Sequence, residues 1–157
     1  MKYQFRETIT YNQLLNVNKL CLFEGEPFQV LDENRLKSAL GNQFQPYEND
    51  ELAFASVFKS LIINHGFMNG NKRTAAIILY ISSLYINDPI KVSDEEFASL
   101  IYKIAGEGGS SISVEEISEL VFKDKRNVCI TKSIPNLEEV IKDYINAHQW
   151  LMIELGK

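Results

Sequence analysis

Residues 65 to 73 read His65-Gly66-Phe67-Met68-Asn69-Gly70-Asn71-Lys72-Arg73, and they separate two strongly apolar segments of the chain. Between positions 52 and 62 the apolar residues recur at helical spacing, and positions 74 to 86 are almost wholly apolar. Such runs predict two buried helices joined by a short polar connection. We expect the second helix to begin just after Gly70.

The start of that second helix has the properties of a phosphate-binding site. The first backbone N–H groups of a helix have no partner within it, and the helix dipole places positive charge there. Gly70 allows the backbone to approach a ligand closely, and Lys72 and Arg73 add full positive charges. The pattern differs from a P-loop, which has two glycines at another spacing and a preceding strand.

His65 and Phe67 stand at the other end of the connection. Histidine is the side chain whose unperturbed pKa lies nearest neutrality, so His65 can accept a proton from an attacking hydroxyl. We expect Phe67 to anchor the loop in the core.

Together these residues resemble the core motif of the Fic/Doc (Fido) family, which reads His-x-Phe-x-Asp/Glu-Gly-Asn-Gly-Arg in its Fic branch. Lys72 stands where the Fic branch has its second Gly, and the continuation from Asn71 to Ala75 resembles the death-on-curing (Doc-like) toxin branch. The resemblance implies that His65 is the general base acting on a target hydroxyl. It also implies that the ATP phosphates are held by Gly70, Asn71, Lys72 and Arg73.

The resemblance implies a reaction as well. Lys in place of the second Gly is associated with ATP bound in the reversed sense, which presents the γ-phosphate. We therefore expect a protein kinase that acts as the toxin of a toxin-antitoxin system, with translation elongation factor Tu as the protein substrate that the family implies. The alternative is a Fic-type AMP transferase (AMPylation), supported by Gly70 and Asn71 and opposed by Lys72.

Asn69 leaves a third interpretation open. The family has an acidic residue there that helps to bind Mg²⁺, and a neutral amide oxygen is a weaker ligand for this cation. Mg²⁺ commonly relies on substrate phosphates, so Asn69 can still position an ion carried by ATP. Otherwise the chain is a catalytically silent module that binds a nucleotide or a partner.

Residues 25 to 32 lie where Fido proteins carry a flap that docks the target segment by strand pairing. Pro27 suits the start of a strand, and Gln29 alternates with the apolar Phe28 and Val30. We expect a short target-docking flap at Phe28, Gln29 and Val30, with an ordinary surface loop as the alternative.

The resemblance also bears on regulation. Many Fic proteins restrain themselves with a helix bearing Ser/Thr-x-x-x-Glu-Gly/Asn, and this chain has no such sequence. Its nearest candidate, from Ser113 to Glu116, is better explained as a helix capping box. Restraint is therefore expected from a cognate antitoxin in trans.

Helix signals recur along the chain. Capping boxes at residues 10–13, 93–96 and 113–116 each precede an apolar repeat, and breaks fall at residues 25–27, 41–46, 87–89 and 106–111. These signals predict an all-α fold, a Fido-type helical bundle with a short β-like flap near the active site. The resemblance covers residues 8–123, so we expect a Fido catalytic domain over residues 1–123 and a C-terminal helical extension over residues 124–157 that packs on it.

The extension has an apolar stripe from Leu137 to Leu155, which predicts one amphipathic helix. This helix either packs on its own chain or contacts a second copy or an antitoxin through Trp150 and Met152. His148 has no acidic or Cys neighbour at metal-binding spacing, and we assign it no role.

Composition limits the class of partner. A chain of 157 residues suits one domain, and its net charge of −5 argues against nucleic acid as the main ligand. The N-terminus has no apolar signal segment, and the apolar run from 75 to 86 is too short to cross a bilayer. We expect a cytoplasmic protein without membrane contact.

Overall fold

The computed structural model describes residues 7–106, 111–123 and 134–157. Its helices are α1 (Tyr11–Cys21), α2 (Glu33–Gly41), the 3-10 turn η1 (Asn42–Phe44), α3 (Asp50–Asn64), α4 (Asn71–Tyr85), α5 (Asp94–Ala105), α6 (Val114–Val121), α7 (Leu137–Ala147) and α8 (Gln149–Leu155). Extended pairing within the described ranges is limited to isolated bridges, Val30 with Phe67 and Ile90 with Phe122. The all-α fold class is confirmed.

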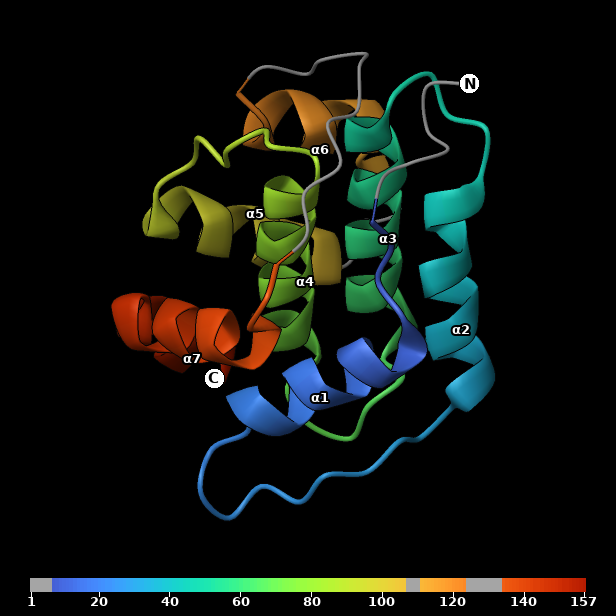
Figure 1. The fold of residues 1–157 in the computed structure, drawn as a ribbon. Coiled ribbons are helices and arrows are strands. Elements are labelled where there is room, and N and C mark those ends of the chain that lie inside the picture. Colours follow the sequence, from blue (N-terminus) through green and yellow to red (C-terminus); the bar gives the residue numbers. More distant parts are fainter. Residues whose placement is uncertain (1–6, 107–110, 124–133) are drawn as a thin grey trace.

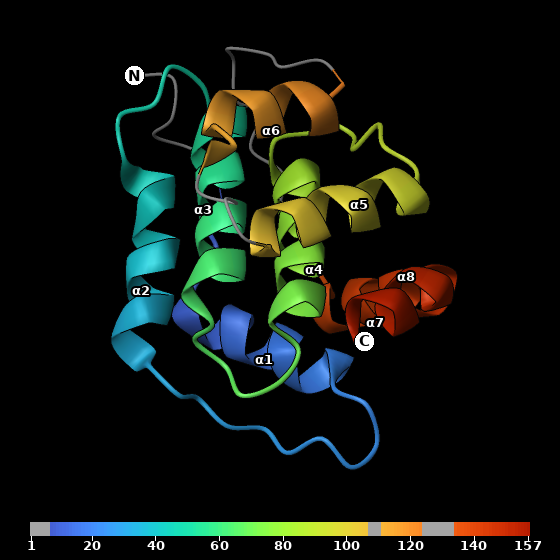
Figure 2. The same cartoon turned by 180° about the vertical axis from the view of Figure 1, so that it is seen from behind.

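Helices α3 and α4 form the centre of the molecule and lie side by side (Figures 1 and 2). In α4 every residue from Arg73 to Leu79 is buried, and α3 is buried over most of its length. Helices that are apolar all round belong inside a protein. The two predicted helices around the motif are therefore the core of the bundle, and α4 begins directly after Gly70 as predicted.

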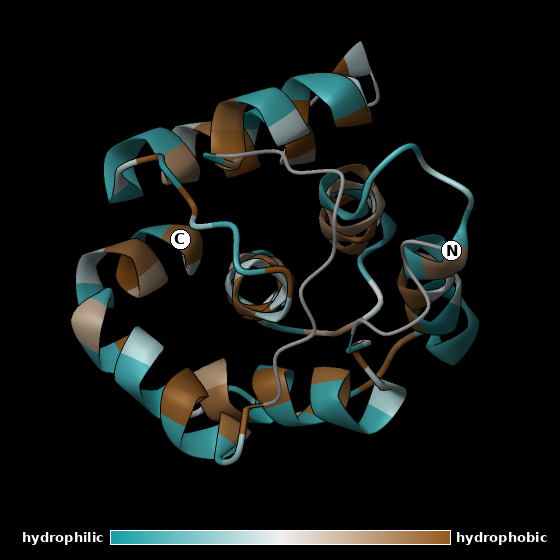
Figure 3. Ribbon diagram, turned by 45° about the horizontal axis from the view of Figure 1, so that its top comes forward, coloured by the Kyte–Doolittle hydropathy of each residue, from teal (hydrophilic) through white to brown (hydrophobic). Residues whose placement is uncertain are grey.

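The surrounding helices cover this pair with one face each. Helices α2 and α6 pack on α3, α1 packs on α4, and α5 and α8 pack on each other. Figure 3 shows hydrophobic and hydrophilic segments alternating along these peripheral helices, as expected for helices that bury one side. None of the described helices is both long and apolar enough to span a membrane.

The predicted caps set the helix starts. The Thr10 hydroxyl accepts from the Gln13 amide and the Gln13 side chain accepts from the Thr10 amide, and Ser93 and Glu96 form the same box. Ser113 also accepts from the amide three residues on. The predicted break at 41–46 begins later than expected, because α2 runs through Gly41 and continues into η1.

The C-terminal extension differs from the single predicted helix. Its described residues, 134–157, form two helices, α7 and α8, which meet at His148. The backbone of His148 leaves the helical range (φ −121°, ψ 42°). Met152 is buried in the core of its own chain, whereas Trp150 is 48% exposed. The described part of the extension thus packs on the bundle, and Met152 is not an exposed contact residue.

Candidate functional site

The connection between α3 and α4 turns through two left-handed residues. His65 caps the end of α3 with φ 48°, and Gly70 precedes α4 with φ 77°. A Cβ atom on Gly70 would lie 3.1 Å from Nδ2 of Asn18. Because a side chain at this position would be both strained and crowded, glycine is the residue that lets the turn close.

The start of α4 presents backbone donors. The first helical bond runs from the Thr74 amide to the Gly70 carbonyl at 2.8 Å, so the amides of residues 71 to 73 precede the helical ladder. The Asn71 side chain is occupied: its Oδ1 accepts from the Phe67 amide at 3.0 Å and its Nδ2 donates to the Phe67 carbonyl at 2.8 Å. Asn71 therefore shapes the loop with its side chain and can offer a ligand its backbone N–H.

Phe67 anchors the loop, as expected, because its side chain is 2% exposed and belongs to the core. The neighbouring backbone pairs with the predicted flap. The Leu31 amide donates to the Gly66 carbonyl at 2.8 Å, and the Met68 amide donates to the Gln29 carbonyl at 2.9 Å. The extended segment after α1 thus runs beside the motif loop (Figure 1).

Because the flap pairs with the motif loop along one edge, the backbone groups on its other edge point away from the loop. In an antiparallel pair, successive residues direct their amide and carbonyl groups to opposite edges. Gln29 and Leu31 face the motif loop, so the backbone groups of Phe28 and Val30 face away from it. The Phe28 ring lies 6.3 Å from the Phe67 ring and is 37% exposed, so the flap has an apolar outer side chain.

The two motif cations have different surroundings. Lys72 is half-buried, and its Nζ lies 5.5 Å from the centre of the Tyr102 ring. Arg73 is 2% exposed and forms a bidentate ion pair with Glu26. The Nη1–Oε1 and Nη2–Oε2 distances are both 2.9 Å. Its Nη1 also donates to the Cys21 carbonyl at 2.5 Å, and the Phe23 ring covers the guanidinium at 3.9 Å.

Glu26 is the partner that the sequence did not reveal. Hydrogen bonds from Arg73 hold the pKa of Glu26 below its ordinary value, so the carboxylate stays charged. The pair joins residues 47 positions apart, and no local motif indicates it. The fork of Arg73 that was predicted to bind phosphate is engaged by Glu26 in this structure.

Asn18 also belongs to the site, and the sequence pattern did not indicate it. Its Nδ2 donates to the Asn69 carbonyl at 2.8 Å and to the Thr74 hydroxyl at 3.0 Å, so it joins the loop to α4. Its Oδ1 and the Nε of Arg73 are buried without a hydrogen-bond partner. Two unsatisfied polar atoms therefore lie beneath the start of α4.

His65 and Asn69 differ in exposure, because Asn69 is half-buried. The His65 side chain is exposed. The Asn69 Nδ2 donates to the Pro27 carbonyl at 3.2 Å, which leaves the amide oxygen as the atom available to a cation. Within the described ranges no group of three His, Cys, Asp or Glu side chains lies close enough to hold a metal. A magnesium ion at this loop would thus depend on Asn69 together with ligands brought by a nucleotide.

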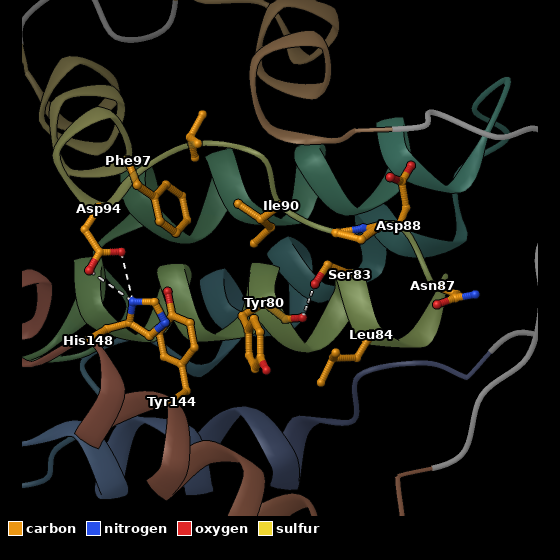
Figure 4. Close-up of a pocket in the computed structure, with 12 residues that line it drawn as sticks. Tyr80, Ser83, Leu84, Asn87, Asp88, Ile90, Asp94, Phe97, Tyr144 and His148 are labelled. Atoms are coloured by element: carbon orange, nitrogen blue, oxygen red, sulfur yellow. Dashed lines mark hydrogen bonds and ion pairs between the residues drawn. The ribbon is translucent and has the colours of Figure 1, made fainter.

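A cavity of about 280 Å³ lies at the opposite end of α4 (Figure 4). Its walls include Tyr80 and Tyr144, whose rings are 4.4 Å apart, and His148, which stacks on Tyr144 at 4.1 Å. His148 Nδ1 lies 2.9 and 3.0 Å from the Asp94 carboxylate oxygens. No Lys or Arg is among the described residues that line this cavity, so it does not suit a polyphosphate.

Comparisons with known proteins give no relative for this chain. No protein-family model, no curated protein and no solved structure matches it.

Proposed function

We propose that the chain is a Doc-like protein kinase toxin that transfers the γ-phosphate of ATP to a hydroxyl group of a target protein. The observation that carries the proposal is the geometry of the 65–73 loop. It holds an exposed histidine at one end and a helix start with open amides and a lysine at the other. A proton acceptor and a phosphate-binding group on one short loop are what phosphoryl transfer requires.

The start of α4 is the proposed phosphate site. The amides of residues 71 to 73 and the Lys72 ammonium supply donors and positive charge, and Gly70 permits the left-handed turn that places them at the helix start. Mg²⁺ bound by ATP would be held through the Asn69 oxygen and would neutralise phosphate charge when bound.

His65 is the proposed general base. The target hydroxyl oxygen forms a bond to the γ-phosphorus, the bond from that phosphorus to the bridging β–γ oxygen breaks, and ADP leaves. The hydroxyl proton passes to His65. An exposed imidazole beside the flap is accessible to a hydroxyl carried by another protein.

The flap is the proposed docking edge for that target. Phe28 and Val30 direct backbone amide and carbonyl groups outward, and an extended target segment can add there as a further strand. The exposed Phe28 ring offers this segment an apolar contact.

Arg73 joins the phosphate site in this proposal once Glu26 has withdrawn. Carboxylate and phosphate compete for the same planar fork of donors, so Glu26 lowers the affinity for ATP while it remains in place. The chain thereby carries a restraint of its own in addition to an antitoxin in trans.

The test is label transfer in a cell lysate. Purified protein, Mg²⁺ and ATP labelled at either the γ- or the α-phosphate are incubated with lysate, with His65→Ala protein as the control. Label from γ-labelled ATP on a protein band that is absent with His65→Ala supports the kinase. Label from α-labelled ATP supports AMP transfer instead, and label from neither contradicts both reactions. Purified elongation factor Tu is the first defined substrate to examine by intact mass.

A further inference from the structure

The C-terminal end of helix α8 contacts two aromatic rings, and each ring lies beside one of the motif cations, Lys72 and Arg73. The Tyr102 hydroxyl of α5 donates to the backbone carbonyl of Glu154, and the same ring lies 5.5 Å from Nζ of Lys72. A Cβ atom on Gly156 would lie 2.4 Å from Cε2 of Phe23, the ring that covers Arg73 at 3.9 Å. The C-terminal turn of α8 is therefore the support behind each ring.

We propose that α8 is a positioning element of the nucleotide site. In this arrangement the Glu154 carbonyl fixes the Tyr102 ring, and the ring holds the Lys72 ammonium at the start of α4. This inference rests on the proposed function, because it assumes that Lys72 binds phosphate. It gives the C-terminal extension a part in a site whose motif lies about eighty residues earlier.

The physical reason is preorganisation. Lysine has a long flexible stem and loses much rotamer freedom when its ammonium is fixed on a ligand. An ammonium already held over an aromatic face by cation–π attraction has less freedom left to lose. Tyr102 is 36% exposed, so the ring lies at the surface beside the place where a nucleotide would enter.

The second contact works through close packing. Gly156 leaves just enough room for the Phe23 ring, and any side chain there pushes the ring away. Phe23 is 37% exposed and can move. Gly156→Ala therefore displaces the cover of Arg73 at small cost to the fold.

The experiment is a calorimetric titration of ATP with Mg²⁺ into the full chain. The variants are Tyr102→Leu, which removes the ring, Tyr102→Phe, which removes only the hydroxyl bonded to Glu154, and Gly156→Ala. The control is Gly41→Ala, because nothing lies within 4 Å of a Cβ atom at Gly41. Thermal melting of each variant checks that it is folded.

We expect Tyr102→Leu to weaken ATP binding about threefold to fivefold, the range of a partly exposed cation–π contact. Tyr102→Phe and Gly156→Ala should weaken it by smaller factors, and Gly41→Ala should leave it unchanged. The decisive readout is the same Tyr102→Leu change in a Lys72→Met background, where we expect it to have no effect on ATP binding.

Two results overturn the inference while leaving the nucleotide site intact. One is that the wild-type protein binds ATP and the Tyr102→Leu variant binds it with the same affinity. The other is an equal loss on Tyr102→Leu in both backgrounds, which indicates a general packing role. If the wild-type protein binds no ATP, the inference fails together with the proposed function.

Discussion

The two ends of α4 differ in shape and in charge. Its C-terminal end borders a cavity of about 280 Å³ with aromatic walls, whereas its N-terminal end has open backbone amides and two cations. A polyphosphate needs donors and positive charge more than it needs a deep hollow. The charged loop therefore suits the proposed nucleotide better than the aromatic-walled cavity does.

Each end also has one of the two histidines of the chain, and their surroundings differ. His65 is exposed on a left-handed backbone position. His148 is paired with Asp94 and stacked on Tyr144, and burial raises the pKa of the Tyr144 phenol. Hydrogen bonding and stacking place His148 in a structural role, which makes it a matched control for His65.

The largest expected effect separates these histidines. His65→Ala should lower the rate of phosphate transfer by about 10²- to 10⁴-fold, because it removes the proton acceptor. His148→Ala should leave that rate unchanged and lower only thermal stability. Initial rates with γ-labelled ATP measure both, and an equal loss in the two variants contradicts the assignment of the site to the N-terminal end.

The next effect concerns Glu26. Glu26→Gln leaves the buried Arg73 guanidinium without its counter-charge and should cost about 1–3 kcal/mol of unfolding free energy, less than a fully buried pair. The same change should tighten ATP binding, because it removes the competitor for the Arg73 fork. Urea unfolding and ATP titration measure the two opposite changes, and weaker ATP binding by Glu26→Gln contradicts the competition.

The same pair has a definite pH dependence. The pKa of Glu26 is lower in the folded protein than its ordinary value of 4.5, so its stabilising contribution is fully present above that value. As pH falls through the lowered folded pKa, the carboxylate is protonated and the contribution is lost. The stability difference between wild type and Glu26→Gln should therefore shrink in acid, which unfolding curves at several pH values can follow.

A smaller effect is expected at the turn that starts α4. Gly70→Ala should cost about 1–2 kcal/mol, because a side chain at φ 77° is strained and its Cβ crowds Asn18. Gly41→Ala is the control, since Gly41 has helical backbone angles and open space around a Cβ. Unfolding curves measure the stability of both variants. If Gly70→Ala and Gly41→Ala are equally stable, the predicted strain at Gly70 is wrong.

The smallest expected effect is at Asn69. Asn69→Asp should increase the affinity for Mg²⁺ in the presence of ATP, while it loses the hydrogen bond to the Pro27 carbonyl, worth about 1 kcal/mol. We expect a modest change in the transfer rate. If the wild-type protein shows no detectable transfer and Asn69→Asp shows clear transfer, the wild-type chain is instead the catalytically silent module.

The sequence predicted the local features of the molecule well. Capping residues correctly predicted the starts of α1, α5 and α6, and Gly70 correctly predicted the start of α4. These features depend on residues a few positions apart, which a sequence displays directly. The core position of Phe67 followed from its place between two buried helices.

Contacts between distant positions could not be predicted in the same way. Glu26 with Arg73, His148 with Asp94 and Tyr102 with Glu154 join residues 47, 54 and 52 positions apart. The first pair forms because α1 and the segment after it pack on α4, and the other two form because α5, α7 and α8 pack together. The break between α7 and α8 was missed for a related reason, because both helices contribute to one apolar stripe in the sequence.

The proposed nucleotide site is tested most directly by an NMR titration of ¹⁵N-labelled protein with ATP and Mg²⁺, because it reports on backbone amides at both ends of α4. We predict the largest shifts at residues 70 to 74 and Tyr102, with those at residues 80 to 90 and 144 to 148 nearly unchanged. Shifts concentrated around the cavity, with residues 70 to 74 unaffected, would contradict the placement of the nucleotide at the start of α4.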